Sequence, residues 1–266
     1  MIERRRFLTS ALAAATAAPE FVQAEQAKSG AGSPEYYVLR HYHLTSGPQR
    51  KLTDNYLKAA LVPALNRLGI SPVGVFGVEV GPASPSLYVL LPSASLETLV
   101  TADFRLVHDD EYNKAGADFL NAPAKDPAYV RVESSLMRAF EGKPRLAKPP
   151  MTPNHNARVF ELRTYESPTD QDHRRKVEMF HSGEFDIFHR TGFWQIFYGD
   201  TLIGANQPNL TYMLGFANIG ERAEKWNAFR NDAQWKKLSS STRFSFENIV
   251  SNVNNLLLTP TAYSQL

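Results

Sequence analysis

The sequence predicts an α+β protein made of two tandem ferredoxin-like (split βαβ) domains that pack sheet to sheet. The first observation behind this prediction is an internal repeat, in which residues 36–112 align without a gap on residues 159–235 at a constant shift of 123. Eleven aligned positions are identical, among them Arg40/Arg163, Arg67/Arg190 and Asp109/Asp232. The second observation is that both copies show the same order of strand and helix patterns. A repeat this long indicates duplicated domains, because solenoid repeats span roughly 20 to 50 residues.

The first copy predicts four strands and two helices. Alternating aromatic and branched residues indicate strands, and apolar residues at helical spacing indicate helices, the first of which ends at Gly69. The predicted strands cover residues 36–43, 73–80, 87–91 and 129–137, and the predicted helices cover residues 49–68 and 95–113.

The second copy repeats this order. Its strands are predicted at residues 159–165, 193–203, 210–216 and 244–250, and its helices at residues 172–190 and 218–238. Asn218 and Glu221 form the N-cap pair of the second helix. The last strands depart from the shift of 123, because aligning Glu133 with Glu247 needs a shift of 114. This alignment predicts about nine extra residues around 121–127 in the first copy.

Strand-helix-strand-strand-helix-strand is the split βαβ order, which gives a four-stranded antiparallel sheet with both helices on one face. The bare face of each sheet needs a cover, and two copies can cover each other. The sequence therefore predicts a dimeric α+β barrel made within one chain. The predicted first domain covers residues 35–142, a proline-rich linker covers 143–155, and the second domain covers 156–266.

The N-terminus predicts export. Arg4 to Leu8 carry the R-R-x-F-L pattern of a twin-arginine signal, followed by an alanine-rich run and a small-residue cleavage site at Val22 to Ala24. The apolar run is too short for a permanent membrane anchor. We therefore expect residues 1–24 to be a signal peptide, residues 25–34 to be a flexible leader, and the mature protein to be periplasmic or secreted.

Composition narrows the function classes. The 266 residues are 43% hydrophobic and 21% charged, which is an average globular composition. The net charge is +2 and the basic residues are scattered, so no nucleic-acid partner is expected. The chain has no cysteine, which excludes disulfides, thiolate metal sites and a cysteine nucleophile. It also lacks G-x-G-x-x-G, P-loop, G-x-S-x-G and H-E-x-x-H motifs.

Several segments resemble the NIPSNAP family. They are V-F-E-L-R-T-Y at 159–165, H-R-T-G-F at 189–193, W-N-A-F-R-N-D-A-Q-W at 226–235 and L-L-L-T-P-T-A-Y-S at 256–264. The resemblance covers residues 158–266 well and residues 36–112 weakly, where Val38 stands at the position of Glu161. It implies a ferredoxin-like fold of the dimeric α+β barrel superfamily, which includes cofactor-free oxygenases and haem proteins. The family name implies a fold more firmly than a reaction.

Strand alternation predicts a candidate site. Tyr37, Leu39 and their equivalents share one strand face, which the apolar content assigns to the helices. The opposite face then lies between the sheets, where charged groups require a partner, water or a ligand. Two interpretations follow, a structural Arg–Glu pair or a ligand pocket. The candidate pocket residues, with one added helix histidine, are Arg40, Tyr42, Glu161, Arg163, Tyr165 and His181.

The seven histidines offer no closed set of metal ligands, so we expect no metal site. His181 and Glu184 lie three apart on a helix, and His41 and His43 share one strand face. We expect no cofactor, although one histidine suffices for haem and His181 is then the best donor.

The leading functional hypothesis is an exported protein that binds a small molecule or a protein partner, with homo-oligomerisation left open. The alternative is a cofactor-free monooxygenase-like enzyme with Glu161 or His181 as base and Arg163 stabilising an oxyanion. Haem binding is the third hypothesis.

Overall fold

The computed structural model describes residues 33–45, 47–78, 81, 83–150 and 158–266. The expected signal peptide at 1–24 and most of the expected leader lie outside these residues, as does the second part of the expected linker. Among the described residues, no helix is both long and apolar enough to cross a membrane.

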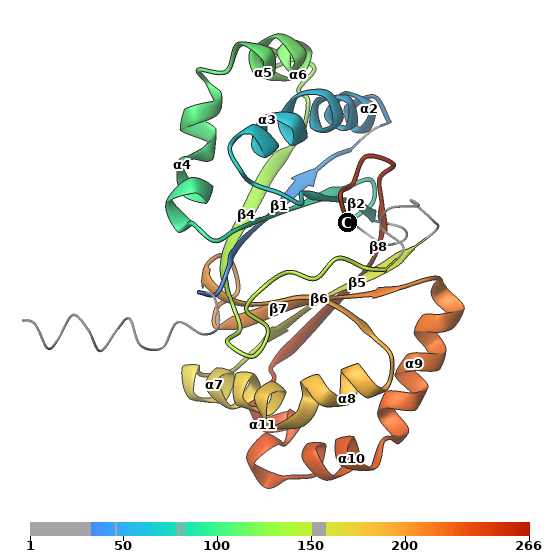
Figure 1. The fold of residues 1–266 in the computed structure, drawn as a ribbon. Helices are drawn as coiled ribbons and strands as arrows, with labels where there is room; N and C mark the ends of the chain where they lie inside the picture. Colours follow the sequence, from blue (N-terminus) through green and yellow to red (C-terminus); the bar gives the residue numbers. More distant parts are fainter. Residues whose placement is uncertain (1–32, 46, 79–80, 82, 151–157) are drawn as a thin grey trace, which may run out of the picture. The chain divides into compact units, whose positions relative to one another are not determined.

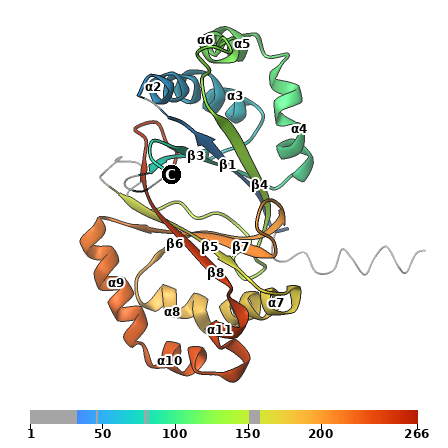
Figure 2. The ribbon, with the colours of Figure 1, turned by 180° about the vertical axis from the view of Figure 1, so that it is seen from behind.

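The described chain from Pro34 onwards forms one compact unit around a closed antiparallel barrel of eight strands (Figure 1). Figure 2 shows the same barrel from behind. The strand order is β1-β3-β2-β8-β5-β7-β6-β4. The strand bounds are β1 Tyr36–His43, β2 Gly74–Val78, β3 Leu87–Ser93, β4 Arg131–Ala139, β5 Val159–Glu166, β6 Trp194–Ile203, β7 Asn209–Phe216 and β8 Asn252–Pro260.

Each half of the chain contributes one ferredoxin-like sheet to the barrel. The first sheet has the order β4-β1-β3-β2 and the second has the order β8-β5-β7-β6, so both follow the split βαβ topology. The edge strands pair across the halves, β2 with β8 and β4 with β6, and these pairings close the barrel. The predicted fold class is confirmed.

Helices cover the outer face of each sheet (Figure 1). The first half contributes α2 Gly47–Tyr56, η1 Leu57–Leu61, α3 Val62–Arg67, α4 Leu96–Leu106, α5 Asp110–Ala115 and α6 Ala117–Leu120. The second half contributes α7 Asp170–Met179, η3 Phe180–Glu184, α8 Phe185–Arg190, α9 Ile219–Asn231, α10 Ala233–Ser239, η4 Thr242–Phe244 and α11 Phe246–Ile249. The helices predicted at 95–113 and 218–238 are each divided in two, because Asp109 and Asp232 cap a new helix.

The two copies agree in fine detail. The π-helical turns η1 and η3 occupy equivalent positions at the shift of 123. Arg67 pairs with Asp109 and Arg190 pairs with Asp232, both with a closest N–O distance of 2.6 Å. The glycines that end the first helix of each copy also have matching positive φ angles of 80° and 81°. The identities Arg67/Arg190, Asp109/Asp232 and Gly69/Gly192 therefore mark local geometry that both copies share.

Aromatic and aliphatic side chains fill the interior of the barrel. This core cluster contains residues from both halves, including Tyr37, Phe76, Phe160, Phe197 and Met213, and their exposed fractions are 1% or less. Leu146, from the segment that joins the halves, also packs against it. The space between the sheets is therefore an apolar core.

This core corrects the predicted assignment of strand faces. Tyr37 and Phe160 point into the barrel, whereas Tyr42 and Tyr165 pack with the helices of their own halves. The predicted alternation of side chains along the strands is correct, but the face assigned to the helices points into the barrel, and the face assigned to the barrel points to the helices. Apolar content could not separate the two faces, because both faces of β1 and of β5 carry buried residues and none of their residues is exposed. The predicted location of Arg40, Tyr42, Glu161, Arg163 and Tyr165 between the sheets is therefore wrong.

The predicted last strand is also wrong. Residues 244–250 form the end of η4 and the short helix α11, and the final strand is β8. In the registers with β1 and β5, Ser135 of β4 is equivalent to Leu256 of β8, which is a shift of 121. The copies thus differ by two residues before their last strands, and the expected insertion of about nine residues does not exist.

Candidate functional site

A pocket of about 380 Å³ lies on the helix-facing side of the second sheet. Strand β5 forms its floor with Arg163 and Tyr165, and helices α9 and α10 form its wall. The lining residues are Arg163, Tyr165, Glu184, Arg222, Ala223, Trp226, Phe229, Arg230 and Trp235. Three of the predicted residues, Glu161, Arg163 and Tyr165, are brought together at or directly behind this pocket.

Glu161 lies behind the pocket with no exposed surface, and both of its carboxylate oxygens are saturated. Oε1 accepts hydrogen bonds from Arg163 Nη1 at 2.6 Å and Arg222 Nη2 at 2.8 Å. Oε2 accepts from Arg222 Nε at 2.8 Å and Trp226 Nε1 at 2.7 Å. Burial alone raises the pKa of Glu161, but the hydrogen bonds from Arg222 and Trp226 and the charge of Arg163 outweigh it and lower that pKa. Glu161 is therefore a fixed anion that holds two arginines.

Arg163 is clamped on three sides by its neighbours on the sheet. Its Nε donates to Tyr212 Oη at 2.8 Å, and its Nη2 donates to Tyr165 Oη at 2.7 Å. Tyr212 is the cross-strand neighbour of Arg163 in the β5–β7 register. The guanidinium also stacks on the Trp226 ring at 4.7 Å. This arrangement holds the guanidinium in one orientation at the pocket floor.

A second buried ion pair lies at the edge of the same pocket. Lys176 Nζ donates to Glu184 Oε2 at 3.0 Å, and both side chains are at most 3% exposed. Lys176 also lies 5.0 Å from the centre of the Tyr165 ring. The charges of Lys176 and Glu184 cancel, so the pair adds polar groups to the edge of the pocket but no net charge.

The charges around the pocket do not cancel. The lining residues and their ion-pair partners contribute four cations, namely Arg163, Arg222, Arg230 and Lys176. They contribute two carboxylates, Glu161 and Glu184, which leaves a surplus of two positive charges. Aromatic rings of Trp226, Phe229 and Trp235 form the apolar wall. A positive floor beside an aromatic wall suits a small organic anion.

The remaining predicted site residues lie elsewhere. Arg40 donates to both oxygens of Asp103 at 2.9 and 3.1 Å, and Tyr42 is buried beside it in the first half. His181 accepts a hydrogen bond from the Gly142 N–H, and its other ring nitrogen bonds the Val177 carbonyl. Both nitrogens of His181 are therefore engaged by backbone, which does not suit a base or an axial haem ligand.

Sequence reasoning did not identify Arg222, Trp226 or Arg230 as site residues. All three lie on α9, and Arg222 and Trp226 are spaced four apart, which places them on one helix face. This spacing could have indicated that Arg222 and Trp226 belong to one site. It would have done so only if Glu161 had been predicted on the strand face that contacts the helices. Because the two strand faces were predicted the wrong way round, Arg222 and Trp226 were not connected with Glu161.

A closed eight-stranded barrel made of two ferredoxin-like halves places the chain in the dimeric α+β barrel class. Residues 160–265, in the second half of the chain, match the NIPSNAP family model. A comparison with curated proteins gives no match.

Solved structures agree with the barrel. A structure described as a putative monooxygenase from Lactobacillus acidophilus has 8% identity and a TM-score of 0.56, covering 86% of this chain and 94% of that chain. One with the same description from Fusobacterium nucleatum has 8% identity and a TM-score of 0.55, over 86% and 93%. A NIPSNAP family protein from Agrobacterium tumefaciens has 24% identity and a TM-score of 0.36, over 41% and 98%. At such identities, the two full-length similarities show the fold alone.

Proposed function

We propose that this protein binds a small organic anion in the pocket between β5 and α9, and that it does so after export from the cytoplasm. The observation that carries the proposal is the sharing of one carboxylate, Glu161, between two arginines that border the pocket. The shared carboxylate fixes both guanidinium groups in place without neutralising both. An anionic ligand would supply the missing negative charge.

The size and the wall of the pocket support the same proposal. Its volume of about 380 Å³ lies within the usual range of small-molecule sites, about 300–1,000 Å³. Trp226 and Trp235 offer flat apolar surfaces, so the ligand class is a carboxylate or phosphate that carries an aromatic or aliphatic body. Tyr165 Oη lies at the floor as a further polar group.

The test starts with native mass spectrometry of the full chain purified from the exported fraction, which reports any co-purifying mass. Titration with a panel of aromatic and aliphatic carboxylates then follows the fluorescence of Trp226 and Trp235. We expect saturable quenching that Arg222→Met and Arg230→Met weaken at least about tenfold, since charge-assisted hydrogen bonds contribute about 1.5–3 kcal/mol each. Arg243→Met is the matched control, because Arg243 pairs with Glu178 at the surface.

Two outcomes would contradict the proposal. One is the absence of saturable binding across the panel together with no co-purifying mass. The other is an equal affinity in the wild type and in both arginine variants. A third measurement addresses the Arg163 clamp: if Arg163→Leu retains the ligand and raises the midpoint of thermal unfolding, the arginine cluster is structural.

The two residues named for the oxygenase alternative do not fit the role of a base. Glu161 accepts four hydrogen bonds and its pKa is lowered, so it has little tendency to take a proton. His181 lies outside the pocket with both ring nitrogens engaged. We therefore favour binding over catalysis.

Export through residues 1–24 remains part of the proposal and rests on the sequence pattern Arg4 to Leu8. Replacing Arg4 and Arg5 with lysine should retain the protein in the cytoplasm if the twin-arginine route carries it. Unchanged export of this variant would contradict that route.

A further inference from the structure

A second group of polar side chains lies far from the anion pocket in the sequence, on strands β1 and β4 of the first half. His41 and His43 come from β1, and Glu133 comes from β4, where it is the register partner of His41. Tyr37, on the same face of β1, belongs to the core cluster of the barrel. The group therefore extends the inward face of β1 towards the end of that strand.

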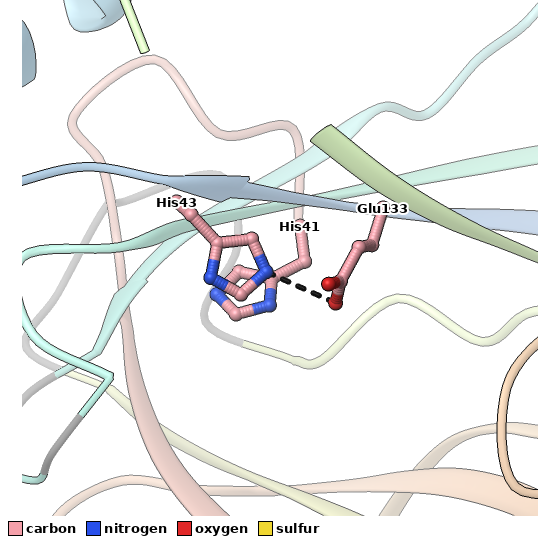
Figure 3. A group of neighbouring side chains, drawn as sticks. All are labelled: His41, His43 and Glu133. Atoms are coloured by element: carbon pink, nitrogen blue, oxygen red, sulfur yellow. Dashed lines mark ion pairs between the residues drawn. The ribbon is translucent and has the colours of Figure 1, made fainter. Parts of the chain in front are cut away.

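The three side chains converge on one point (Figure 3). One ligand atom of each residue lies within 4.8 Å of the ligand atoms of the other two. His43 Nε2 is 3.0 Å from Glu133 Oε2, and the two imidazole rings lie 3.7 Å apart between centres. An ion with bonds of about 2.0–2.2 Å separates its ligand atoms by roughly 3–4 Å, so small side-chain rotations suffice to close the site.

His41 carries the observation that points to a ligand. Its Nε2 is buried and has no hydrogen-bond partner among the described residues. Its ring is held by stacking on Tyr88, with 4.1 Å between ring centres. A buried imidazole nitrogen without a partner is costly unless something else binds it.

The charges that face the group are those of Glu133 and Arg131. Arg131 Nε donates to Glu133 Oε1 at 2.8 Å, which leaves Oε2 directed at His43. Both side chains are more than half exposed, at 58% and 57%, so solvent screens the arginine charge. One carboxylate oxygen remains available for a cation while the other keeps its arginine.

The second copy does not repeat this group. At the equivalent strand positions it carries Thr164, Glu166 and Asn254, which contain no imidazole. Histidines at 41 and 43 are thus a specialisation of the first half, independent of the pocket in the second half.

We infer that His41, His43 and Glu133 form a binding site for a divalent transition-metal ion of the zinc, cobalt or nickel type. Two imidazoles and one carboxylate are the donor set these ions accept, and three protein ligands leave coordination positions open. Sequence reasoning expected no metal site because two histidines alone do not close a ligand set. The third ligand becomes visible only through the β1–β4 register.

The test is isothermal titration of the full, tag-free chain with ZnCl₂ after removal of bound metals with a chelator. We expect one equivalent of Zn²⁺ to bind, and His41→Ala and His43→Ala to weaken binding at least about tenfold. The isosteric variant Glu133→Gln keeps the shape of an exposed side chain and should also weaken binding. Titration with Co²⁺ should give the absorption bands of a nitrogen- and oxygen-liganded ion in the wild type and lose them in His43→Ala.

His189→Ala is the matched control, because His189 is an exposed histidine on α8. Its Zn²⁺ affinity should equal that of the wild type. Circular dichroism checks that the three cluster variants remain folded, and Glu133→Gln decides the outcome if a histidine variant unfolds. Absence of saturable Zn²⁺ and Co²⁺ binding in the wild type, or an unchanged affinity in the cluster variants, would overturn the inference.

Discussion

Glu161→Gln is the substitution that best tests the charge arrangement behind the pocket between β5 and α9. It keeps the shape of the side chain, but one carboxylate oxygen becomes an NH₂ group that cannot accept a hydrogen bond. Each oxygen of Glu161 accepts two hydrogen bonds, so two of the four donors from Arg163, Arg222 and Trp226 lose their acceptor. The buried guanidinium of Arg163 also loses its counter-charge.

Removing one partner of a buried ion pair costs about 3–5 kcal/mol, and we expect a loss of unfolding free energy of this size. For a chain of this length, each kcal/mol shifts the unfolding midpoint by about 2–4 °C, which gives a decrease of roughly 6–20 °C. Urea denaturation followed by far-UV circular dichroism measures the free energy, and calorimetry measures the midpoint. Glu224→Gln, at an exposed position of α9, should stay within about 0.5 kcal/mol of the wild type.

The same comparison has a pH dependence with a defined sign. The folded-state pKa of Glu161 lies below its unfolded value, so its stabilisation is fully present above an unfolded pKa of about 4.3. It is lost as the pH falls through the folded-state pKa. The difference between wild type and Glu161→Gln should therefore be constant near neutral pH and shrink below about pH 4. A loss under about 1 kcal/mol at pH 7, typical of exposed ion pairs, would refute the buried bridge.

Three further predictions follow from the fold. Phe160→Ala should cost about 3–5 kcal/mol in urea denaturation, because the side chain is fully buried in the barrel, and a loss under about 1 kcal/mol would contradict a filled interior. Asp232→Ala should remove the N-cap of α10, cost about 1 kcal/mol and speed amide exchange at its first turn; unchanged exchange would contradict the cap. Gly192→Ala should cost about 1–2 kcal/mol, because φ is 81° there, whereas Gly47→Ala, with open space around it, should be tolerated. Equal effects of the two glycine substitutions on the unfolding midpoint would contradict the strain argument.

The sequence was sufficient for the topology, because the repeat and the period of each segment are local signals. Strand β1 was predicted with its observed bounds, and the order of strands and helices up to α10 was correct. The direction in which each strand face is buried could not be predicted from the local sequence. The face of a strand depends on which side closes into the barrel, and Tyr37 and Val38 are both apolar and both buried. The final strand was missed because residues 244–250 look extended but are held in α11, whose C-terminal Ile249 packs into a buried cluster.

In the candidate sites, too, residues that stand out within one strand could be predicted, whereas residues that join a site through contacts distant in sequence could not. Arg163 and Tyr165 were identified because charged and hydroxyl groups stand out on a buried strand. Arg222 required the contact between α9 and β5, which is 61 residues away in the sequence. The pair His41 and His43 was visible, yet Glu133 joins them only through strand pairing.

The two halves place one arginine at the same strand position and give it different neighbours. In the first half Arg40 binds Asp103, which occupies the helix position equivalent to Trp226. In the second half the carboxylate stands on the strand, as Glu161 in place of Val38, and the helix position holds an indole. Moving the negative charge from the helix to the sheet leaves the guanidinium of Arg163 anchored from behind and its front open to the pocket. Because the barrel holds both halves in equivalent geometry, these two substitutions replace the Arg40–Asp103 ion pair with an arginine that is anchored to a strand carboxylate and borders the pocket.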